Sequence, residues 1–232
     1  MIDLPNTENQ IHYVTNFKDL VATPFHTEIN AICWTRTLRG DFGEIVKQIP
    51  LEENIAELDQ EALSALQLSE QGQIACEIIL NDLKLLKALG ASPILNLINC
   101  YDRDDEHPFF QRDVYSFHVD RSPLPTDTFL CTYYGVSSEI LPNSQAVQKV
   151  LVPEIRGELK KIYRGAGEDF ESFLSEHFFD LHYQAKPGAR PVSLGLGNLW
   201  KLATDHPGSQ TPPCLHRAPT EKKGENRLLL IC

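Results

Sequence analysis

Residues 192–231 read VSLGLGNLWKLATDHPGSQTPPCLHRAPTEKKGENRLLLI, and this stretch decides the fold of the chain. Short runs of apolar residues alternate here with turns rich in glycine and proline, which is the pattern of short strands. The predicted strands are Val192–Leu196, Leu199–Leu202, Cys214–Arg217 and Arg227–Ile231. Short strands at this spacing are typical of a β-sandwich or a jelly-roll barrel.

The same strand pattern extends upstream as far as residue 93. Aromatic and β-branched residues predict strands at Ile94–Ile98, Val114–Phe117 and Phe129–Tyr134. Two amphipathic stretches, Pro153–Arg164 and Glu168–Phe179, interrupt the strands and are predicted to be helices.

The first 92 residues have a different character, and their clearest element is a helix over Ser69–Leu89. Its apolar residues recur at helical spacing, Asp82 falls on the same face, and Gly90 ends it. Loop is predicted for most of the first forty residues. The other predicted elements are a strand near Ala31–Thr37 and short helices at Gly40–Gln48 and Ile55–Leu66.

These elements predict an α+β fold with one folding unit. A mainly helical N-terminal half, residues 1–92, packs on a double-stranded β-helix (jelly-roll) barrel formed by residues 93–232. No linker separates the two halves, so we expect residues 1–232 to form a single domain.

Composition excludes several classes of protein. A net charge of −11 argues against a nucleic-acid-binding surface, because phosphate contacts need clustered Lys and Arg. No run of apolar residues is long enough for a transmembrane helix, and the polar N-terminus does not resemble a signal peptide. The six cysteines lack CxxC spacing, which favours free thiols in a reducing cytoplasm. The sequence names no partner and leaves the oligomeric state open.

The segment Phe117-His118-Val119-Asp120 contains an H-x-D pattern. Alternate residues of a strand point to the same face, so the side chains of His118 and Asp120 can converge on one metal ion. The pattern is short enough to arise by chance, and a surface loop is the alternative for this pair alone.

A second element of the same candidate site lies near the C-terminus. His216 and Arg227 stand eleven positions apart across a polar, glycine-containing turn, which predicts adjacent antiparallel strands of one hairpin. Two histidines and one carboxylate on one face of a metal form the facial triad of non-haem Fe(II) oxygenases. An inward arginine suits a dicarboxylate such as 2-oxoglutarate, since its planar fork pairs with a carboxylate.

Each of these residues also has a purely structural interpretation. His216 could cap a turn between Pro213 and Pro219, and Arg227 could pair with Glu221 or Glu225. His182 and His206 lie in loop-like contexts, which are typical of surface histidines.

Four segments of the chain resemble a bacterial family catalogued as domain of unknown function 1826. They are Phe117–Asp120, Leu130–Gly135, Leu215–Pro219 and Arg227–Leu230, and the resemblance covers residues from about 114 to the end. The chain departs from the family pattern near Pro125–Asp127, and at Ile140, where the family has a tryptophan.

The motif order of that family is similar in turn to that of Fe(II)- and 2-oxoglutarate-dependent dioxygenases. This similarity implies that His118, Asp120 and His216 are the metal ligands and that Arg227 holds the cosubstrate. It further implies that Tyr133 donates a hydrogen bond to the same carboxylate. Lys201 matches a lysine of the family and could contact an anion, or it could be a surface lysine.

Three functions follow as hypotheses from these residues. The first is an Fe(II), 2-oxoglutarate-dependent dioxygenase that hydroxylates an unidentified small molecule or peptide. The second is a zinc protein or hydrolase that uses the same triad. The third is a cupin-like binding module without catalytic activity.

Overall fold

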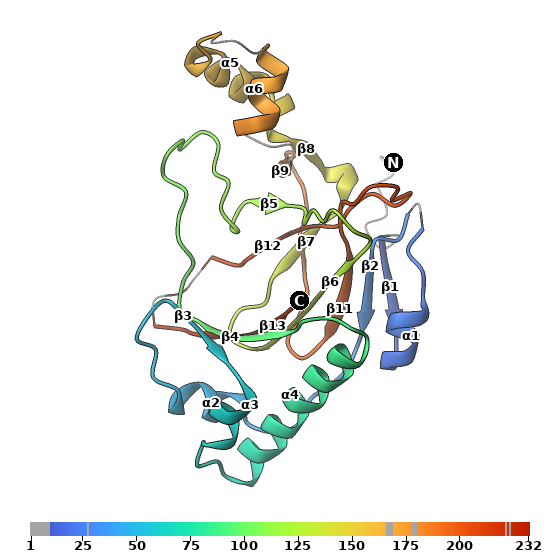
Figure 1. The fold of residues 1–232 in the computed structure, drawn as a ribbon, viewed down its shortest axis with the longest axis vertical. Coiled ribbons are helices and arrows are strands. Elements are labelled where there is room, and N and C mark those ends of the chain that lie inside the picture. The colour runs from blue at the N-terminus through green and yellow to red at the C-terminus, as the bar shows by residue number, and fades with distance from the viewer. Residues whose placement is uncertain (1–9, 27, 166–168, 178–180, 221, 223) are drawn as a thin grey trace.

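The computed structural model describes residues 10–26, 28–165, 169–177, 181–220, 222 and 224–232. The chain folds into two β-sheets that pack against each other, with helices on the outside (Figure 1). The predicted mixed α+β class is therefore confirmed. No helix of the described residues is long and apolar enough to span a membrane.

The larger sheet has seven strands in the order β1-β2-β11-β6-β13-β4-β3. Among the described strands of this sheet, the β1–β2 pair alone is parallel. The strands are β1 (Ile11–Val14), β2 (Ala31–Trp34), β3 (Ile55–Leu58), β4 (Ile94–Ile98), β6 (Asp127–Tyr134), β11 (Leu199–Ala203) and β13 (Arg227–Ile231).

The smaller sheet has six strands in the order β10-β7-β12-β5-β9-β8, and all its pairs are antiparallel. The strands are β5 (Phe117–His118), β7 (Glu139–Leu141), β8 (Ala146–Gln148), β9 (His182–Ala185), β10 (Val192–Ser193) and β12 (Leu215–Arg217).

The pairing of the two sheets follows a simple rule. Strands β4, β5, β6 and β7, taken in chain order, pair with β13, β12, β11 and β10 respectively. Successive strands alternate between the two sheets: β4 and β6 lie in the larger sheet, whereas β5 and β7 lie in the smaller one. The chain thus runs back along itself as a long hairpin that is wound into two sheets.

Within the described residues, six α-helices and the two short 3₁₀ helices η2 and η3 surround the sheets. They are α1 (Phe17–Ala22), α2 (Phe42–Gln48), α3 (Gln60–Ser64), α4 (Glu70–Ala88), α5 (Pro153–Ile162), α6 (Phe170–His177), η2 (Asn143–Gln145) and η3 (Lys149–Leu151). Helices α1 to α4 each begin at a residue whose side chain accepts a backbone N–H of the first turn, namely Asn16, Asp41, Asp59 and Ser69.

The helix α4 forms the main outer layer. Its buried face, which includes Ile79, Leu83 and Leu86, packs on the outward side chains of the larger sheet, which include Leu228 and Leu230 (Figure 1). The opposite face of that sheet carries Leu130, Trp200 and Leu229, which pack on Ile140 of the smaller sheet. The interior between the sheets is where the candidate site lies.

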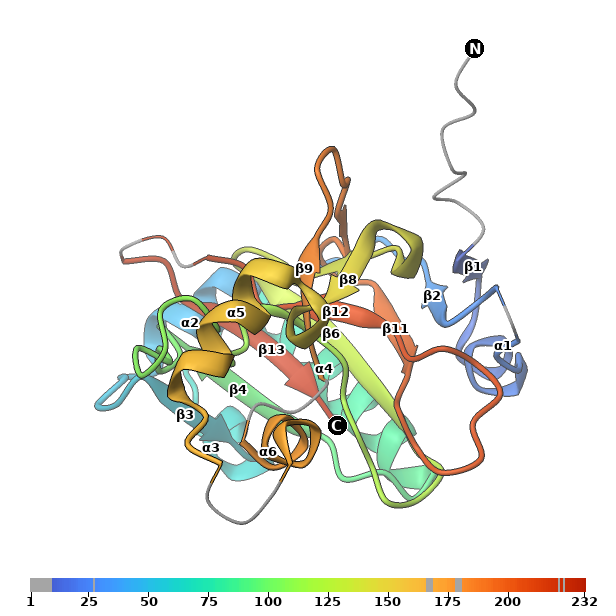
Figure 2. The ribbon, with the colours of Figure 1, turned by 90° about the horizontal axis from the view of Figure 1, so that it is seen from above.

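An insert between β7 and β10 adds β8 and β9 to the smaller sheet and carries α5 and α6 (Figures 1 and 2). Seen from above in Figure 2, the two helices lie nearest to the viewer. They have a core of their own, in which Leu159 and Leu174 pack against Phe110 of an earlier loop.

Several predicted elements differ from the structure. The predicted helix over Ile55–Leu66 is a strand, β3, followed by the short helix α3, because Asp59 caps a new helix there. The first forty residues contain β1 and α1 besides β2, so residues 1–92 are not only a helical support: they contribute three strands to the larger sheet. The ends of the predicted helix at 168–179 lie outside the described residues, as do residues 1–9.

Candidate metal centre

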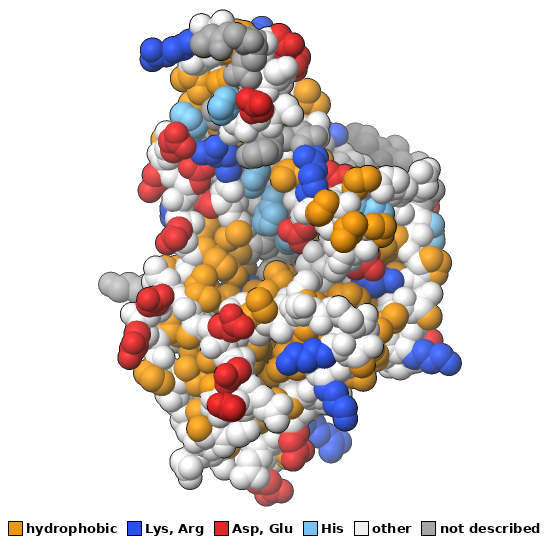
Figure 3. All heavy atoms as spheres, viewed as in Figure 1, with side chains coloured by type: hydrophobic (Ala, Val, Ile, Leu, Met, Phe, Trp, Pro, Cys, Tyr) orange, Lys and Arg blue, Asp and Glu red, His pale blue; other side chains and the backbone are white. Residues whose placement is uncertain are grey.

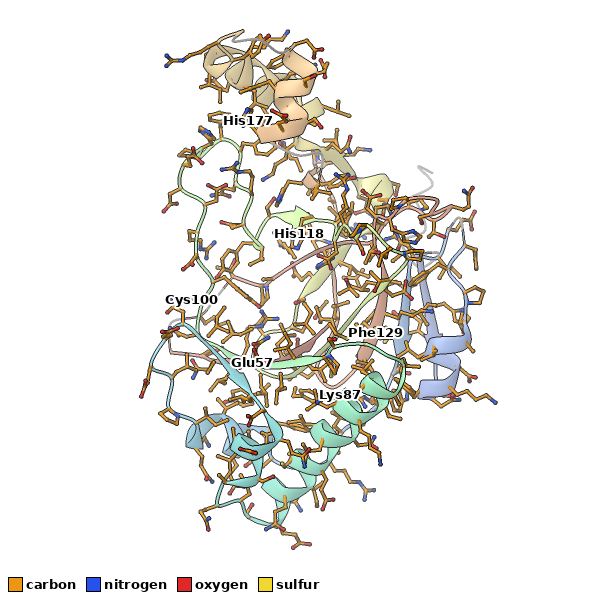
Figure 4. The ribbon with its side chains drawn as sticks, viewed as in Figure 1. Glu57, Lys87, Cys100, His118, Phe129 and His177 are labelled. Carbon is orange, nitrogen blue, oxygen red and sulfur yellow. The ribbon has the colours of Figure 1, made fainter. Side chains whose placement is uncertain are left out.

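His118 and His216 come from neighbouring strands of the smaller sheet. His118 lies on β5, His216 lies on β12, and the two residues are directly opposite in the antiparallel register. Directly opposite residues project to the same face, so the two imidazole rings meet with their centroids 4.5 Å apart. Figure 4 labels His118 on β5, close to β12.

Asp120 completes the cluster from two positions beyond His118. The intervening Val119 is buried in a separate apolar cluster, as strand alternation requires. One ligand atom from each of His118, Asp120 and His216 lies within 4.8 Å of the others, and His216 Nε2 is 3.6 Å from Asp120 Oδ2. The structure thus brings together the three residues that the sequence predicted, at a spacing that suits one metal ion.

Hydrogen bonds set the tautomer of both histidines. His118 Nδ1 is 2.8 Å from the carbonyl oxygen of Ser116, and His216 Nδ1 is 3.3 Å from that of Cys214. A carbonyl oxygen can only accept, so Nδ1 carries the proton in each ring and Nε2 keeps its lone pair. Backbone carbonyls orient metal-ligating histidines in this way in many metalloproteins.

Asp120 is held by contacts from the larger sheet and from a following loop. Thr128 on β6 donates its hydroxyl to Asp120 Oδ2 at 2.5 Å, and the amide of Asp205 donates to the backbone carbonyl of Asp120 at 2.7 Å. The hydroxyl engages one lone pair of one oxygen, so the carboxylate can still bind a metal.

The environment keeps the imidazole of His118 neutral. Burial, together with the neighbouring His216, lowers the pKa of His118 to about 4. A neutral imidazole is the form that binds a metal, so the ring is ready for coordination over the whole physiological pH range.

His182 lies beside this cluster, so the prediction of a surface histidine in a loop was wrong. It lies on β9 directly opposite His118, with the ring centroids 5.8 Å apart and its Nδ1 3.4 Å from Ser116 Oγ. The segment around His182 carries no motif that marks it, since its proximity depends on how the insert pairs with β5.

Acid is expected to destabilise the metal-free protein through these histidines. Burial lowers the pKa of His182, like that of His118, to about 4, against 6.5 for an ordinary imidazole. Above about pH 6.5 both rings are neutral in the folded protein and in the unfolded chain alike. Between about 6.5 and 4 the unfolded chain binds them and the folded protein does not, so stability falls as the pH falls. We expect a loss on the order of 1–2 kcal/mol per ring between about pH 7 and about pH 5.

The measurement is urea unfolding of chelator-treated protein at those two pH values. His182→Gln should lose less stability in acid than the wild type, because one of the two rings is gone. Equal acid sensitivity of the two proteins would show that His182 is not protected from protonation.

Arg227 lies in the interior, but not where the sequence predicted. We expected it on a strand next to His216 in one hairpin, whereas β12 belongs to the smaller sheet and β13 to the larger one. The connection crosses between the sheets because β13 pairs with β4 and β6. Arg227 is 5% exposed and donates from Nη2 to Ser138 Oγ at 3.1 Å, so it faces the smaller sheet.

Tyr133 lies on the wrong face of β6 for the predicted contact with a cosubstrate. Its hydroxyl donates to Asp82 of α4 at 2.7 Å, and its ring stacks on Phe42 of α2. Alternate residues of β6 point to opposite faces, so Thr128 and Thr132 point into the interior between the sheets and Tyr133 points toward the helices. The pairing of β6 with β13 shifts register at this end of the strand.

Lys201 also points away from the triad. It lies directly opposite Phe129 on the helix-covered face, donates to the carbonyl oxygen of Thr23 at 2.7 Å, and lies over the ring of Phe25. It is 4% exposed, so neither the predicted anion contact nor a surface position is correct. Of the six residues predicted for the site, four therefore face the interior between the sheets.

Figure 3 shows histidine side chains gathered beside a hollow on this face of the molecule, with hydrophobic side chains along its lower wall.

Comparison of the chain with protein-family models, with curated proteins and with solved structures finds no match in any of the three. The candidate centre therefore rests on its own geometry, which is that of two oriented imidazoles and one carboxylate around a common point.

Proposed function

We propose that the protein is a non-haem Fe(II) dioxygenase that uses 2-oxoglutarate to hydroxylate its substrate. One observation carries the proposal: His118, Asp120 and His216 converge with the Nε2 lone pair of each imidazole directed away from a backbone carbonyl. Two histidines and one carboxylate that leave further positions open are the ligand set of non-haem Fe(II) oxygenases.

The topology supports a double-stranded β-helix, which is the finer fold that we propose. Four consecutive strands, β4 to β7, pair in reverse order with β13 to β10 and alternate between two sheets, as a jelly roll requires. The H-x-D strand and the strand of the second histidine are neighbours in this arrangement, which is why residues 98 positions apart, 118 and 216, share one site.

The interior offers groups that fit a dicarboxylate. Arg227 and Ser138 meet there, and Thr132 lies on the inward face of the strand next to Arg227. The hydroxyl of Thr132 is buried and makes no hydrogen bond within the described part of the chain. A buried hydroxyl without a partner costs free energy, which a bound carboxylate would relieve.

Iron and its oxo-acid cosubstrate would supply the oxidising chemistry for C–H hydroxylation. The chain would contribute the rest. His118, Asp120 and His216 would hold the metal, Thr128 would orient the carboxylate of Asp120, and the apolar interior would exclude water.

The resemblance to the family of unknown function 1826 stays a prediction, since no family model matches the chain. The proposal does not depend on it, because the triad and the strand pairing stand without it.

The test is an anaerobic titration with Fe(II), with and without 2-oxoglutarate, followed in the visible range. A charge-transfer band that appears only with both components supports the proposal. Iron binding without a band would exclude 2-oxoglutarate as the cosubstrate. Selective retention of Zn²⁺ with a hydrolytic activity would favour the zinc function instead.

Arg227→Met should weaken 2-oxoglutarate binding by about tenfold to a hundredfold, because a charge-assisted hydrogen bond contributes roughly 1.5–3 kcal/mol. Iron affinity should stay unchanged. The band titration measures both quantities, and Arg227→Lys should recover only part of the loss because lysine lacks the planar fork.

The matched control is Arg217→Met. Arg217 pairs with Glu139 at 2.7 Å and lies over Phe117, so it belongs to the other face of β12. It should leave both affinities unchanged. Equal effects of the two substitutions would mean that Arg227 acts only on folding.

A further inference from the structure

The insert between β7 and β10 supplies the neighbour of the strand that carries His118. Its strand β9 pairs with β5, and its strand β8 pairs with β9 (Figure 1). Without the insert, β5 would be the edge of the smaller sheet beside the candidate centre. The insert therefore forms one wall next to the metal ligands.

The register aligns a row of side chains along this wall. His216, His118 and His182 are directly opposite one another on β12, β5 and β9. Gln148 at the end of β8 is opposite Tyr183, and Lys149 follows it as the first residue of η3, which contacts β9. Directly opposite residues share a face, so the row runs from the two metal ligands to His182. Lys149 lies near enough for its charge to help lower the pKa of His182.

Lys149 is a half-buried cation without a carboxylate partner. Its Nζ donates to the carbonyl oxygen of Gln111 at 2.6 Å and lies 5.6 Å from the centre of the Phe110 ring. No ion pair joins it to a carboxylate of the described residues. Burial lowers the pKa of Lys149 to about 8, as expected for an ammonium group that lacks a contacting anion.

The acidic residues nearby are engaged elsewhere. Asp104 pairs with Arg112 at 2.9 Å, and Asp113 accepts the amides of Asp104 and Tyr115 with its two oxygens. Lys149 thus keeps donor capacity for an anion that the protein itself does not supply.

We propose that Lys149 and His182 bind an acidic group of the substrate, a carboxylate or a phosphate, while another part of the same molecule lies at the His118–Asp120–His216 centre. This assignment rests on the proposed function. Strands are about 4.8 Å apart, so β8 lies roughly 10 Å from β5, and the substrate is an acidic molecule of several bonds in length. At this distance the acidic group of the substrate occupies a different place from the cosubstrate carboxylate, which would lie next to the metal.

The test uses metal-free protein with isotope-labelled histidine rings, so that its outcome does not depend on iron or on 2-oxoglutarate. The probes are inorganic phosphate and benzoate, and the ring resonance of His182 is identified with His182→Gln. We expect a saturable shift of His182 with at least one probe. Phosphate alone would indicate a phosphorylated substrate, and benzoate alone would indicate a carboxylic acid.

Lys149→Met should lower the affinity for the probe by about tenfold or more. Lys149→Arg should bind the probe with an affinity within a few-fold of that of the wild type. Lys186→Met is the matched control, because Lys186 also belongs to the insert and donates to a backbone carbonyl, that of Ser144, but is exposed. It should bind the probe as the wild type does.

Two results would overturn the assignment. One is that neither probe shifts His182, and the other is that Lys149→Met binds as tightly as the wild type. Iron titration of the same variants keeps the two proposals apart: Lys149→Met that binds Fe(II) and 2-oxoglutarate normally is folded, so its loss of probe binding reports on this subsite alone.

Discussion

Replacing His118 by alanine is expected to lower the affinity for Fe(II) or Zn²⁺ by at least about a hundredfold. His118 supplies one of three ligands, and even residues that only orient a ligand typically contribute ten- to a hundredfold to metal affinity. Asp120→Ala and His216→Ala should behave alike, because all three residues bind the same ion. Competition against a chromogenic chelator measures the affinity, and circular dichroism checks the fold.

Two further variants make this prediction sharp. Thr128→Val removes only the hydroxyl that donates to Asp120, so it should lower the metal affinity by about tenfold. His182→Gln removes the imidazole next to His118 that lies outside the ligand cluster, and metal affinity should be unchanged. Normal binding by His118→Ala, together with a loss in His182→Gln, would move the site away from the triad.

Asp82→Ala is expected to destabilise the protein by about 3–5 kcal/mol, which would lower the melting temperature by roughly 10 °C. Asp82 is fully buried on α4 and accepts two hydrogen bonds from Arg36, at 2.8 and 2.5 Å, and one from Tyr133. Its removal leaves the guanidinium of Arg36 buried without its counter-ion. Urea unfolding and thermal unfolding both measure the loss.

Three further variants test whether the burial of this ion pair causes the loss. Tyr133→Phe removes one hydrogen bond and should cost about 1 kcal/mol. Glu158→Ala breaks an exposed pair with Lys161 and should stay within about 0.5 kcal/mol of the wild type. The double variant Asp82→Leu with Arg36→Met should recover much of the stability. A loss near 1 kcal/mol in Asp82→Ala would show that water reaches the pair.

Much of the secondary structure could be read from local patterns. The helix predicted over Ser69–Leu89 is α4, Glu70–Ala88, and the last predicted strand, Arg227–Ile231, is β13 without a change of bounds. In both, the apolar residues follow the period of the element, and Ser69 and Gly90 mark the ends of α4. The helix prediction over Ile55–Leu66 was wrong because an edge strand, of which only Leu58 is buried, and a short helix follow each other within this short segment.

The triad of the candidate site was predicted for a similar reason. His118 and Asp120 are two residues apart, and strand alternation alone puts them on one face. His216 was added because a second histidine completes a facial triad, and only the β5–β12 pairing brings it to the other two. Asp82 shows the limit, since the sequence placed it on the apolar face of α4 but could not show its partner, Arg36.

The sequence by itself determined many of the helices and strands, and which residues of one strand share a face, because these properties depend on neighbours a few positions away. Only the tertiary structure decided which face of a strand meets the interior, and therefore that Tyr133 and Lys201 point toward the helices while Arg227 points inward. It also decided that His182 lies beside His118 and that Lys149 lies near His182. The physical reason is that strand pairing joins distant segments, and the register of each pair is set by the packing of the whole molecule.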